Sequence, residues 1–282
     1  MKYKLTVVTV TYKPNEDELR LFLESYRRYN DLGDDAKMII VDNSPLGSWD
    51  IDSMEAEFAE VDFISNPSNP GFGASNNLGY IQYESECVLF INNDVELLQT
   101  LFKDLISEFA KDEKIGCIGI HQDGGAPSFF PKMTVPKGTK IDIFDDHLHF
   151  ISGAFMLFRS DIFEEIGMFD ENIFMYFEEF DLSERLIAKG YKTVFLPEYK
   201  FLHKAGGRRT SSEFASMKGT QTQHYICRKY HLRYNLAMNW GYVFRQCNLI
   251  VYNILTLNFR EVPKLVRIIC YRIRYVWTHR NK

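Results

Sequence analysis

Short apolar runs alternate with amphipathic stretches over the first half of the chain. The apolar, β-branched runs predict strands, and the stretches with apolar residues at helical spacing predict helices. The predicted strands are Leu5–Thr11, Met38–Val41, Val61–Ser65 and Cys87–Ile91, and the predicted helices are Glu16–Tyr29 and Ser75–Tyr83. Strands that alternate with helices indicate an α/β fold with a parallel sheet and right-handed crossovers. In such folds ligands bind at the carboxyl ends of the strands.

The second half of the chain continues the alternation and then becomes helical. Gln122–Lys140 is rich in Gly, Pro and Lys, and we interpret it as a loop near the site. The later predicted elements are two segments at His149–Arg159 and Ser160–Gly167, a helix that starts with acidic residues, a strand at Thr193–Leu196 and a polar loop at His203–Arg209. We therefore expect a catalytic domain over residues 1–224 and a helical extension over residues 225–282.

Charge divides the chain into the same two parts. The 282 residues include 33 Lys or Arg and 38 Asp or Glu; eleven of the bases but a single acid, Glu261, lie in Tyr225–Lys282. The extension thus carries a net charge of +10 and the rest of the chain −15, which is typical of an acidic body with a tail that binds an anionic surface. The five cysteines show no paired or metal-ligand spacing, and the N-terminus enters a strand without a signal peptide, so we expect a reducing cytoplasm.

The extension predicts a helix that lies in a membrane interface. The uncharged run Gln246–Phe259 has fourteen residues, whereas a membrane-spanning helix needs about 20. In the last segment one helical face carries apolar residues and the opposite face is basic; the two sets are Val266, Ile269, Ile273 and Val276, and Lys264, Arg267, Tyr271 and Arg274. The alternative is a helical pair packed on the catalytic domain or on a second copy of the chain. Basic and aromatic residues also interleave, but no RNA-binding signature is present, and we expect no nucleic-acid partner.

The most informative segment is Ile173–Gly190. It places Glu178, Glu179, Asp181 and Glu184 within seven residues at a helix start, directly after a run of apolar side chains. Acidic residues in a first turn stabilise a helix by about 0.3–1 kcal/mol each, so ordinary capping is one interpretation. Capping does not explain the apolar lead-in. An apolar wall raises the pKa of a carboxyl group and suits it to general-base catalysis.

Three further motifs follow predicted strands. Asn69–Gly79 (NPGFGASNNLG) is able to cradle phosphate with backbone N–H groups or to form a simple capped turn, but it lacks the third glycine of a dinucleotide-binding loop. Ile91–Val95 (INNDV) offers a carboxylate beside two amides, which suits either a divalent cation or a plain turn. His203 is a structural residue or a Mn²⁺ ligand, and Arg208 beside it suits a diphosphate.

In order and spacing, these motifs resemble inverting glycosyltransferases of family 2 with the GT-A fold. The resemblance covers about residues 4–210 and rests on VTVTYKP (8–14), VDNS (41–44), the glycine-rich and INNDV motifs, the segment 152–191 and the His203 loop. It implies a Rossmann-like, mainly parallel sheet flanked by helices, and within the family it is greatest to bacterial rhamnosyltransferases of O-antigen, capsule or cell-wall synthesis. The implied reaction is metal-dependent transfer of L-rhamnose from dTDP-rhamnose to a lipid-linked oligosaccharide at the cytoplasmic face of the bacterial membrane.

The resemblance also implies site residues. Those for the nucleotide sugar are Thr11, Tyr12, Asp42, Asn69, Gly71, Phe72, Asn77, Asn93 and Arg208, with Asp42 reading the pyrimidine base. The ligands of Mn²⁺ or Mg²⁺ are Asn92, Asp94 and His203, where an amide replaces the first carboxylate of the family's Asp-x-Asp motif. The catalytic residues are Glu179, Glu178 and Asp181. Glu179 stands where the family places its catalytic base, usually Asp, and Glu178 is the alternative base.

Other functions stay open at this point. The same fold would accept UDP-galactofuranose, UDP-galactose or UDP-glucose as donor. A sugar nucleotidyltransferase would share the sheet, but it should carry a glycine-rich loop with a basic residue directly after the first strand, where this chain has YKPNEDE. A non-catalytic sugar-binding protein would lack the base, whereas Glu178, Glu179 and Asp181 are all present.

Overall fold

The computed structural model describes residues 2–123, 151–203, 213–231 and 236–279, without the side chains of residues 236–241. The chain divides into two compact units. The first unit contains the sheet and its helices up to residue 207. The second contains the helices after residue 208 together with Met175–Phe177.

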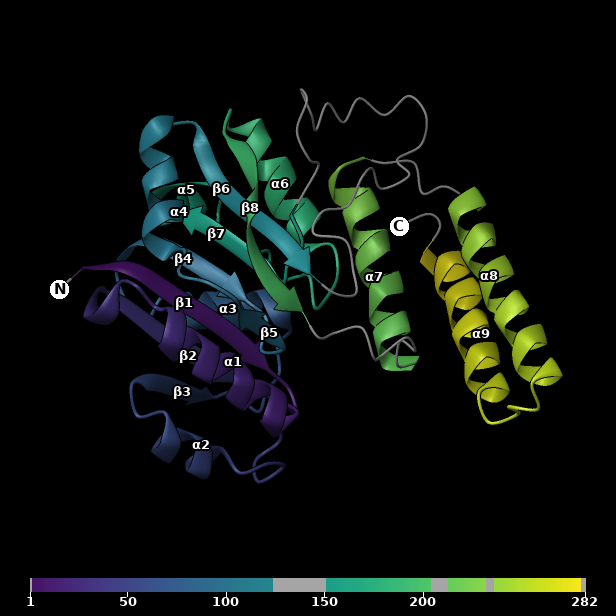
Figure 1. The fold of residues 1–282 in the computed structure, drawn as a ribbon. Coiled ribbons are helices and arrows are strands. Elements are labelled where there is room, and N and C mark those ends of the chain that lie inside the picture. Colours follow the sequence, from purple (N-terminus) through teal and green to yellow (C-terminus); the bar gives the residue numbers. More distant parts are fainter. Residues whose placement is uncertain (1, 124–150, 204–212, 232–235, 280–282) are drawn as a thin grey trace. The chain divides into compact units, whose positions relative to one another are not determined.

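One mixed sheet organises the first unit (Figure 1). Its strands are β1 (Tyr3–Thr11), β2 (Ala36–Asp42), β3 (Val61–Ser65), β4 (Ser85–Ile91), β5 (Val95–Leu97), β6 (Ile115–Asp123), β7 (Phe155–Arg159) and β8 (Lys192–His203). Among the residues described, the order is β3-β2-β1-β4-β7-β6-β8-β5. The first four strands are parallel, as predicted, and so are β6 and β8; β7 runs antiparallel to β4 and β6, and β5 runs antiparallel to β8. The carboxyl ends of β1, β2 and β4 therefore lie along one edge.

Helices cover both faces of this sheet (Figure 1). They are α1 (Glu16–Tyr29), α2 (Ile51–Glu57), α3 (Phe72–Tyr80), α4 (Phe102–Glu108), α5 (Ser160–Glu165) and α6 (Glu178–Ala188), with short 3₁₀ turns at Gly33–Asp35 and Phe109–Lys111. Leu5 and Val7 of β1 belong to an apolar cluster with α1, α2 and α4. Val8 belongs to a second cluster with α3, α5 and α6. Both faces of β1 are therefore buried, and its apolar residues do not alternate strictly with polar ones.

Two predicted boundaries differ from the structure in ways that affect the site. Helix α3 begins at Phe72, three residues before the predicted start, because Gly71 turns the chain with a φ of 115° directly before it. Strand β8 continues seven residues beyond its predicted end, so His203 is the last residue of a strand and not part of a loop. Gln122 is likewise part of β6, and residues 124–140 of the predicted loop lie outside the described part of the chain.

The second unit contains α7 (Glu213–Lys229), α8 (Leu236–Leu255) and α9 (Val262–His279). Helix α9 buries Leu265, Ile268 and Arg272. The Arg272 guanidinium donates to Thr220 Oγ1 of α7 at 3.1 Å and lies 4.1 Å from the centroid of the Tyr242 ring of α8, so one buried cation joins all three helices. None of the helices described is long and apolar enough to cross a membrane.

Residues 175–177 belong to the second unit although they directly precede α6. Thr222 Oγ1 of α7 donates to the Met175 carbonyl oxygen at 3.0 Å. Gly219 of the same helix leaves room for the Tyr176 ring, since a Cβ there would lie 3.1 Å from a ring carbon. The φ angles of Tyr176 and of the next residue are 70° and 72°, a left-handed conformation that costs about 1–3 kcal/mol per residue and persists where neighbouring structure holds it.

Candidate active site

Asp42, at the end of β2, is a buried carboxylate with a full set of hydrogen-bond donors. Its Oδ1 accepts hydrogen bonds from Thr11 Oγ1 (2.8 Å) and from Ser44 Oγ and N (2.6 and 3.2 Å). Its Oδ2 accepts one from the Trp49 indole Nε1 (3.0 Å). A carboxylate has about four lone-pair sites, and all are used here. A nucleobase is therefore able to donate a hydrogen bond to Asp42 only where one of these donors moves away. Trp49 is the donor best placed to do so, because it lies partly exposed in the loop before α2.

An exposed aromatic ring directly follows the last residue of β1. Tyr12 is 52% exposed, and Lys13 Nζ lies 5.7 Å from the centroid of its ring. The Lys13 backbone N–H donates to Ser44 Oγ at 2.6 Å, which ties the ends of β1 and β2 together. The edge of the sheet thus combines a hydrogen-bond acceptor for a base with a surface on which a ring can stack.

The glycine-rich loop packs closely on the segment that leads to α6. The Phe72 backbone N–H donates to the Phe174 carbonyl oxygen at 2.8 Å. A Cβ on Gly71 would lie 2.5 Å from that oxygen, so only glycine allows this approach. Asn69 before it has a φ of 44°, and its backbone N–H donates to the Asn66 carbonyl oxygen. Gly71 and Asn69 therefore shape the loop through the backbone.

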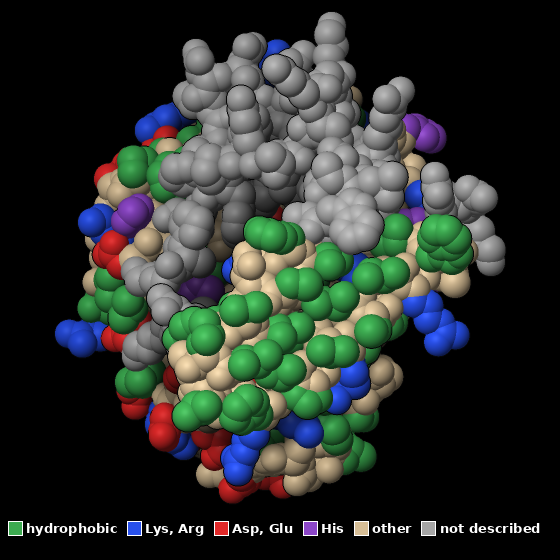
Figure 2. All heavy atoms as spheres, turned by 90° about the vertical axis from the view of Figure 1, so that its right-hand side faces the viewer, with side chains coloured by type: hydrophobic (Ala, Val, Ile, Leu, Met, Phe, Trp, Pro, Cys, Tyr) green, Lys and Arg blue, Asp and Glu red, His purple; other side chains and the backbone are tan. Residues whose placement is uncertain are grey.

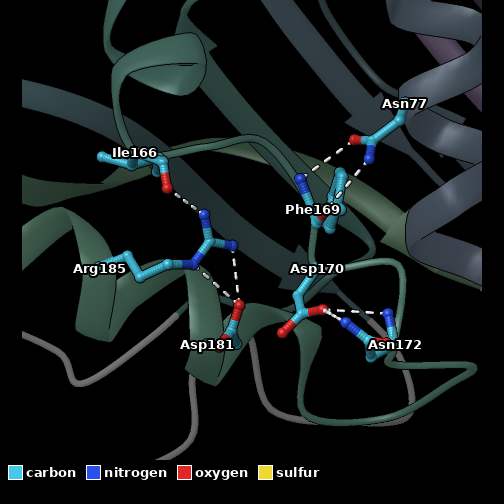
Figure 3. A network of polar contacts seen from close by, with 7 residues as sticks. All are labelled: Asn77, Ile166, Phe169, Asp170, Asn172, Asp181 and Arg185. Atoms are coloured by element: carbon cyan, nitrogen blue, oxygen red, sulfur yellow. Dashed lines mark hydrogen bonds and ion pairs between the residues drawn. The ribbon is translucent and has the colours of Figure 1, made fainter. Parts of the chain in front are cut away.

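Asn77 holds the turn after α5 (Figure 3). Its Oδ1 accepts from the Phe169 backbone N–H at 3.0 Å, and its Nδ2 donates to the Phe169 carbonyl oxygen at 3.0 Å and to Glu171 at 3.1 Å. Phe72 meets the Phe169 ring edge to face, with centroids 6.0 Å apart. The Asn77 amide is thus occupied by the protein at both ends, so the geometry favours a structural role over direct contact with the nucleoside.

Asp94 and His203 come together although 109 residues separate them. Strand β5 begins at Val95, which pairs with His203 at the end of β8, and His203 Nε2 lies 3.0 Å from Asp94 Oδ1. The His203 side chain is 9% exposed and that of Asp94 is 24% exposed. Within the described part of the chain no group of three or more His, Cys, Asp or Glu side chains forms a metal site. One carboxylate and one imidazole nevertheless fit a Mn²⁺ or Mg²⁺ ion whose remaining ligands come from substrate phosphates, Asn92 or water.

Glu179 is partly buried at the start of α6 and anchored to the same edge of the sheet. Its Oε1 accepts the backbone N–H of Gly153 at 3.0 Å, and a Cβ at Gly153 would lie 2.5 Å from that oxygen. The next residue, Ala154, accepts the backbone N–H of Asn92 at 3.2 Å, so Glu179 and the INNDV motif are joined through one short segment. Burial raises the pKa of Glu179, opposed by the hydrogen bond from Gly153. This makes the carboxylate a stronger base.

The other acidic residues of α6 differ in their surroundings. Asp181 forms an ion pair with Arg185, whose Nε and Nη2 lie 3.0 and 2.8 Å from Asp181 Oδ2, and Arg185 Nη1 donates to the Ile166 carbonyl oxygen (Figure 3). The pair thus cross-links α6 to the turn after α5. Burial, and then the nearby Asp181 charge, raise the pKa of Glu184 to about 7. Glu178 is 5% exposed.

Three groups of predicted site residues lie along one edge of the sheet, in addition to the glycine-rich loop, Asp181 and His203 described above. Thr11, Tyr12 and Asp42 surround the ends of β1 and β2, and Asn92, Asn93 and Asp94 follow β4; Glu178 and Glu179 begin α6. Arg208 lies outside the described residues. Sequence reasoning did not single out Trp49 or Gly153. The SGA motif at residues 152–154 contained the second of these, but nothing in its pattern points to a hydrogen bond with Glu179.

Comparison with known proteins gives one family and distant relatives. The family model described as "Glycosyl transferase family 2" matches residues 6–167. The "Low-salt glycan biosynthesis hexosyltransferase Agl10" of Haloferax volcanii is 26% identical over 215 residues, which cover 64% of this chain and 61% of that protein. The "N-acetylglucosaminyl-diphospho-decaprenol L-rhamnosyltransferase" of Mycobacterium tuberculosis is 25% identical over 253 residues, which cover 75% of this chain and 80% of that protein.

A solved structure resembles nearly the whole chain. The mannosyltransferase PcManGT from Pyrobaculum calidifontis, in complex with GDP-Man and Mn²⁺, has a TM-score of 0.60 at 13% identity and covers 99% of this chain and 88% of its own. At that identity the likeness concerns the fold alone.

Proposed function

Because this chain belongs to glycosyl transferase family 2, whose model matches residues 6–167, we propose that it transfers L-rhamnose from dTDP-rhamnose to a lipid-linked oligosaccharide. The chain is a glycosyltransferase, and the GT-A fold predicted from its sequence is confirmed. The rhamnose donor is supported by the name of the mycobacterial relative, and the diphospho-decaprenol in that name supports a lipid-linked acceptor. The proposed place is the inner face of a bacterial cytoplasmic membrane, to which the enzyme binds peripherally.

The observation that supports the mechanism is the partly buried carboxylate of Glu179, anchored by the Gly153 N–H. One oxygen accepts the Gly153 N–H, which leaves the second oxygen to accept the proton of an acceptor hydroxyl. Its raised pKa brings it closer to the operating pH, where general-base catalysis is most effective. The deprotonated hydroxyl attacks the anomeric carbon in line with the departing diphosphate, and one displacement inverts that centre. Glu178 is the alternative base.

Asp94 and His203, with Asn92, would hold a Mn²⁺ or Mg²⁺ ion. This is supported by the 3.0 Å approach of His203 Nε2 to Asp94 Oδ1 at the end of β5 and β8. Such an ion, when bound, stabilises the negative charge that develops on the leaving diphosphate. The solved mannosyltransferase of similar fold is a complex with Mn²⁺.

Thr11, Tyr12 and Asp42 would bind the nucleoside, together with Asn93 and Arg208. A pyrimidine such as thymine has an N–H group that is able to donate to Asp42 Oδ2 in place of the Trp49 indole, which now occupies that position at 3.0 Å. The Phe72 N–H is taken by the Phe174 carbonyl oxygen, so the next N–H groups of α3 would lie toward the phosphates, because helix N-termini favour anions.

The alternative functions are now fewer. Membership of the family removes the sugar nucleotidyltransferase and the non-catalytic binding protein. Other donors remain, because the relative from Haloferax volcanii is named a hexosyltransferase. UDP-galactofuranose and UDP-hexoses are therefore the second candidates.

The test is a donor panel with divalent metal. The full chain is incubated with dTDP-rhamnose, UDP-galactofuranose, UDP-galactose or UDP-glucose and Mn²⁺, and released nucleoside diphosphate and pyrophosphate are separated by chromatography. We expect dTDP to be released from dTDP-rhamnose, and this sugar nucleotide to raise the melting temperature most, since a ligand at about 100 times its Kd adds roughly 2.7 kcal/mol. Release from a UDP-sugar alone would replace the rhamnose assignment, and pyrophosphate as the product would refute glycosyl transfer.

A further inference from the structure

Helices α8 and α9 of the second unit carry a broad apolar face (Figure 2). Six large apolar side chains on it are 43% to 77% exposed: Phe244, Val251 and Leu255 of α8, and Val266, Ile273 and Trp277 of α9. Large contiguous apolar patches are uncommon on monomeric proteins and mark interaction sites. The face is therefore a candidate docking surface, and the question is what covers it.

The spacing of these residues shows that the face is organised. In each helix the three residues are separated by seven and then four positions, which places them along one side. The side of α9 that packs inside the unit is a different one, formed by Leu265, Ile268 and Arg272. The apolar stripes are thus not required for the packing that the unit already has.

Cations accompany the apolar stripes. Arg245 of α8, Arg260 of the turn and Arg274 of α9 are exposed, and Figure 2 shows Lys and Arg side chains beside the apolar area. Not every cation of α9 contributes, because Arg267 pairs with Glu213 at 2.9 Å and Arg272 is buried. Residues 225–282 carry a net charge of +10. Two copies of this face would bring like charges together, whereas anionic lipid headgroups complement them.

We propose that this face, with α8 and α9 lying side by side along the surface, docks on an anionic lipid bilayer. The apolar stripes enter the boundary between headgroups and acyl chains, while the arginines contact the headgroups. Trp277, at the end of its stripe, suits the headgroup level. The biological role of this docking rests on the proposed function, because a lipid-linked acceptor lies in such a bilayer.

Vesicle sedimentation of the full chain tests this. Vesicles of phosphatidylcholine with or without phosphatidylglycerol are used at low and high salt, and no sugar nucleotide is present. The apolar test variant is Leu255→Glu with Trp277→Glu, and the charge variant is Arg245→Gln with Arg274→Gln. The matched control is Ile81→Glu, which makes the same change at a 64% exposed position of the first unit.

We expect wild type and Ile81→Glu to sediment with the phosphatidylglycerol vesicles and to be released by salt. The apolar variant should lose at least tenfold in partitioning. The charge variant should lose about thirty-fold at low salt, which corresponds to about 1 kcal/mol for each cation. Circular dichroism and melting temperature should stay as in wild type, because all four changed positions are exposed.

Equal partitioning of all variants, or no binding of wild type at low salt, would overturn the proposal. Light scattering without lipid gives the other contrary result: a stable dimer that the apolar variant dissociates would make this face an interface between two copies. Donor turnover is measured separately without vesicles. If the protein binds vesicles but has no donor turnover, the proposed function is contradicted and the docking surface is supported. If it turns over donor but does not bind vesicles, the docking surface is contradicted and the proposed function is supported.

Discussion

Replacing Glu179 by Gln should remove the base while keeping its place in the fold. Gln retains an Oε1 atom to accept the Gly153 N–H at 3.0 Å, so the link between α6 and the sheet edge persists. The second oxygen becomes an amide nitrogen that cannot accept a proton from the acceptor. General-base catalysis contributes about 10²–10⁴ in rate, or about 3–5 kcal/mol of barrier. We expect kcat to fall by that factor and the Kd of the nucleotide sugar to change by less than about twofold.

The same substitution should stabilise the protein at high pH. Burial raises the folded-state pKa of Glu179 above its ordinary value of 4.5. A carboxyl group with a raised folded-state pKa contributes stability that is present below its unfolded-state pKa and is lost as the pH rises through the folded-state value. The amide of the Glu179→Gln variant does not titrate. The melting temperature of this variant relative to wild type should therefore increase as the pH rises from the ordinary value of 4.5 toward the raised folded-state pKa, which calorimetry at several pH values measures.

Turnover and donor binding, measured for three variants, decide between the possible bases. Turnover is followed as nucleoside diphosphate released in the presence of acceptor, and donor binding as the shift in melting temperature. Glu184→Gln is the matched control, because it neutralises a carboxyl on the same helix whose pKa burial also raises, to about 7. It should keep near-normal turnover. Near-normal turnover of Glu179→Gln with an inactive Glu178→Gln would move the role to Glu178, and normal turnover of both would refute a base on α6.

Further substitutions test the metal, the base-reading site and the ion pair of α6. Asp94→Ala should weaken nucleotide-diphosphate binding and make it insensitive to Mn²⁺ in titration calorimetry, because the phosphates are held largely through the cation; full wild-type activity in excess EDTA would contradict this. Nucleotide binding should change the tryptophan fluorescence of wild type, as the Trp49 indole leaves Asp42 Oδ2, and an equal change in Trp49→Phe would exclude that displacement. Asp181→Asn leaves the Arg185 cation without its buried partner and should lower the free energy of unfolding by about 3 kcal/mol in urea titrations, with the donor Kd unchanged; a change in Kd alone would instead assign Asp181 to the nucleotide site.

The parallel half of the fold follows from its sequence because burial leaves a strong signal there. Both faces of β1 are covered, so its apolar run predicts the strand to within two residues. The start of α3 was misplaced because it depends on one backbone angle at Gly71, which no periodicity reveals. The extent of β8 was underestimated because Pro197, Glu198 and Lys200 interrupt its apolar pattern, while its pairing with β5 and β6 keeps the strand extended.

The sequence offers candidate site residues but not their arrangement. Strand ends and helix starts indicated Asp42, Asp94 and Glu179. Their partners depend on contacts distant in sequence, such as the pairing of β5 with β8 that brings His203 to Asp94. The Trp49 bond to Asp42 depends on the path of a loop. In α9, the alternation of apolar and basic residues did not reveal that Arg272 is the buried residue, because a stacked ring and hydrogen bonds compensate its charge.

Because residues 175–177 are attached to α7, the C-terminal helices should not be exchangeable by themselves between related proteins. A chimera that takes its last helices from a relative, joined after residue 210, would inherit Thr222 and Gly219 from one parent and the Met175 segment from the other. Thr222 and Met175, which share a hydrogen bond, are 47 residues apart in the sequence. Residues 175–177 directly precede α6, the helix that carries Glu179. We therefore expect a chimera to fold when residues 175–177 and α7 come from the same parent. In a lineage, substitutions in one piece should be accompanied by substitutions in the other.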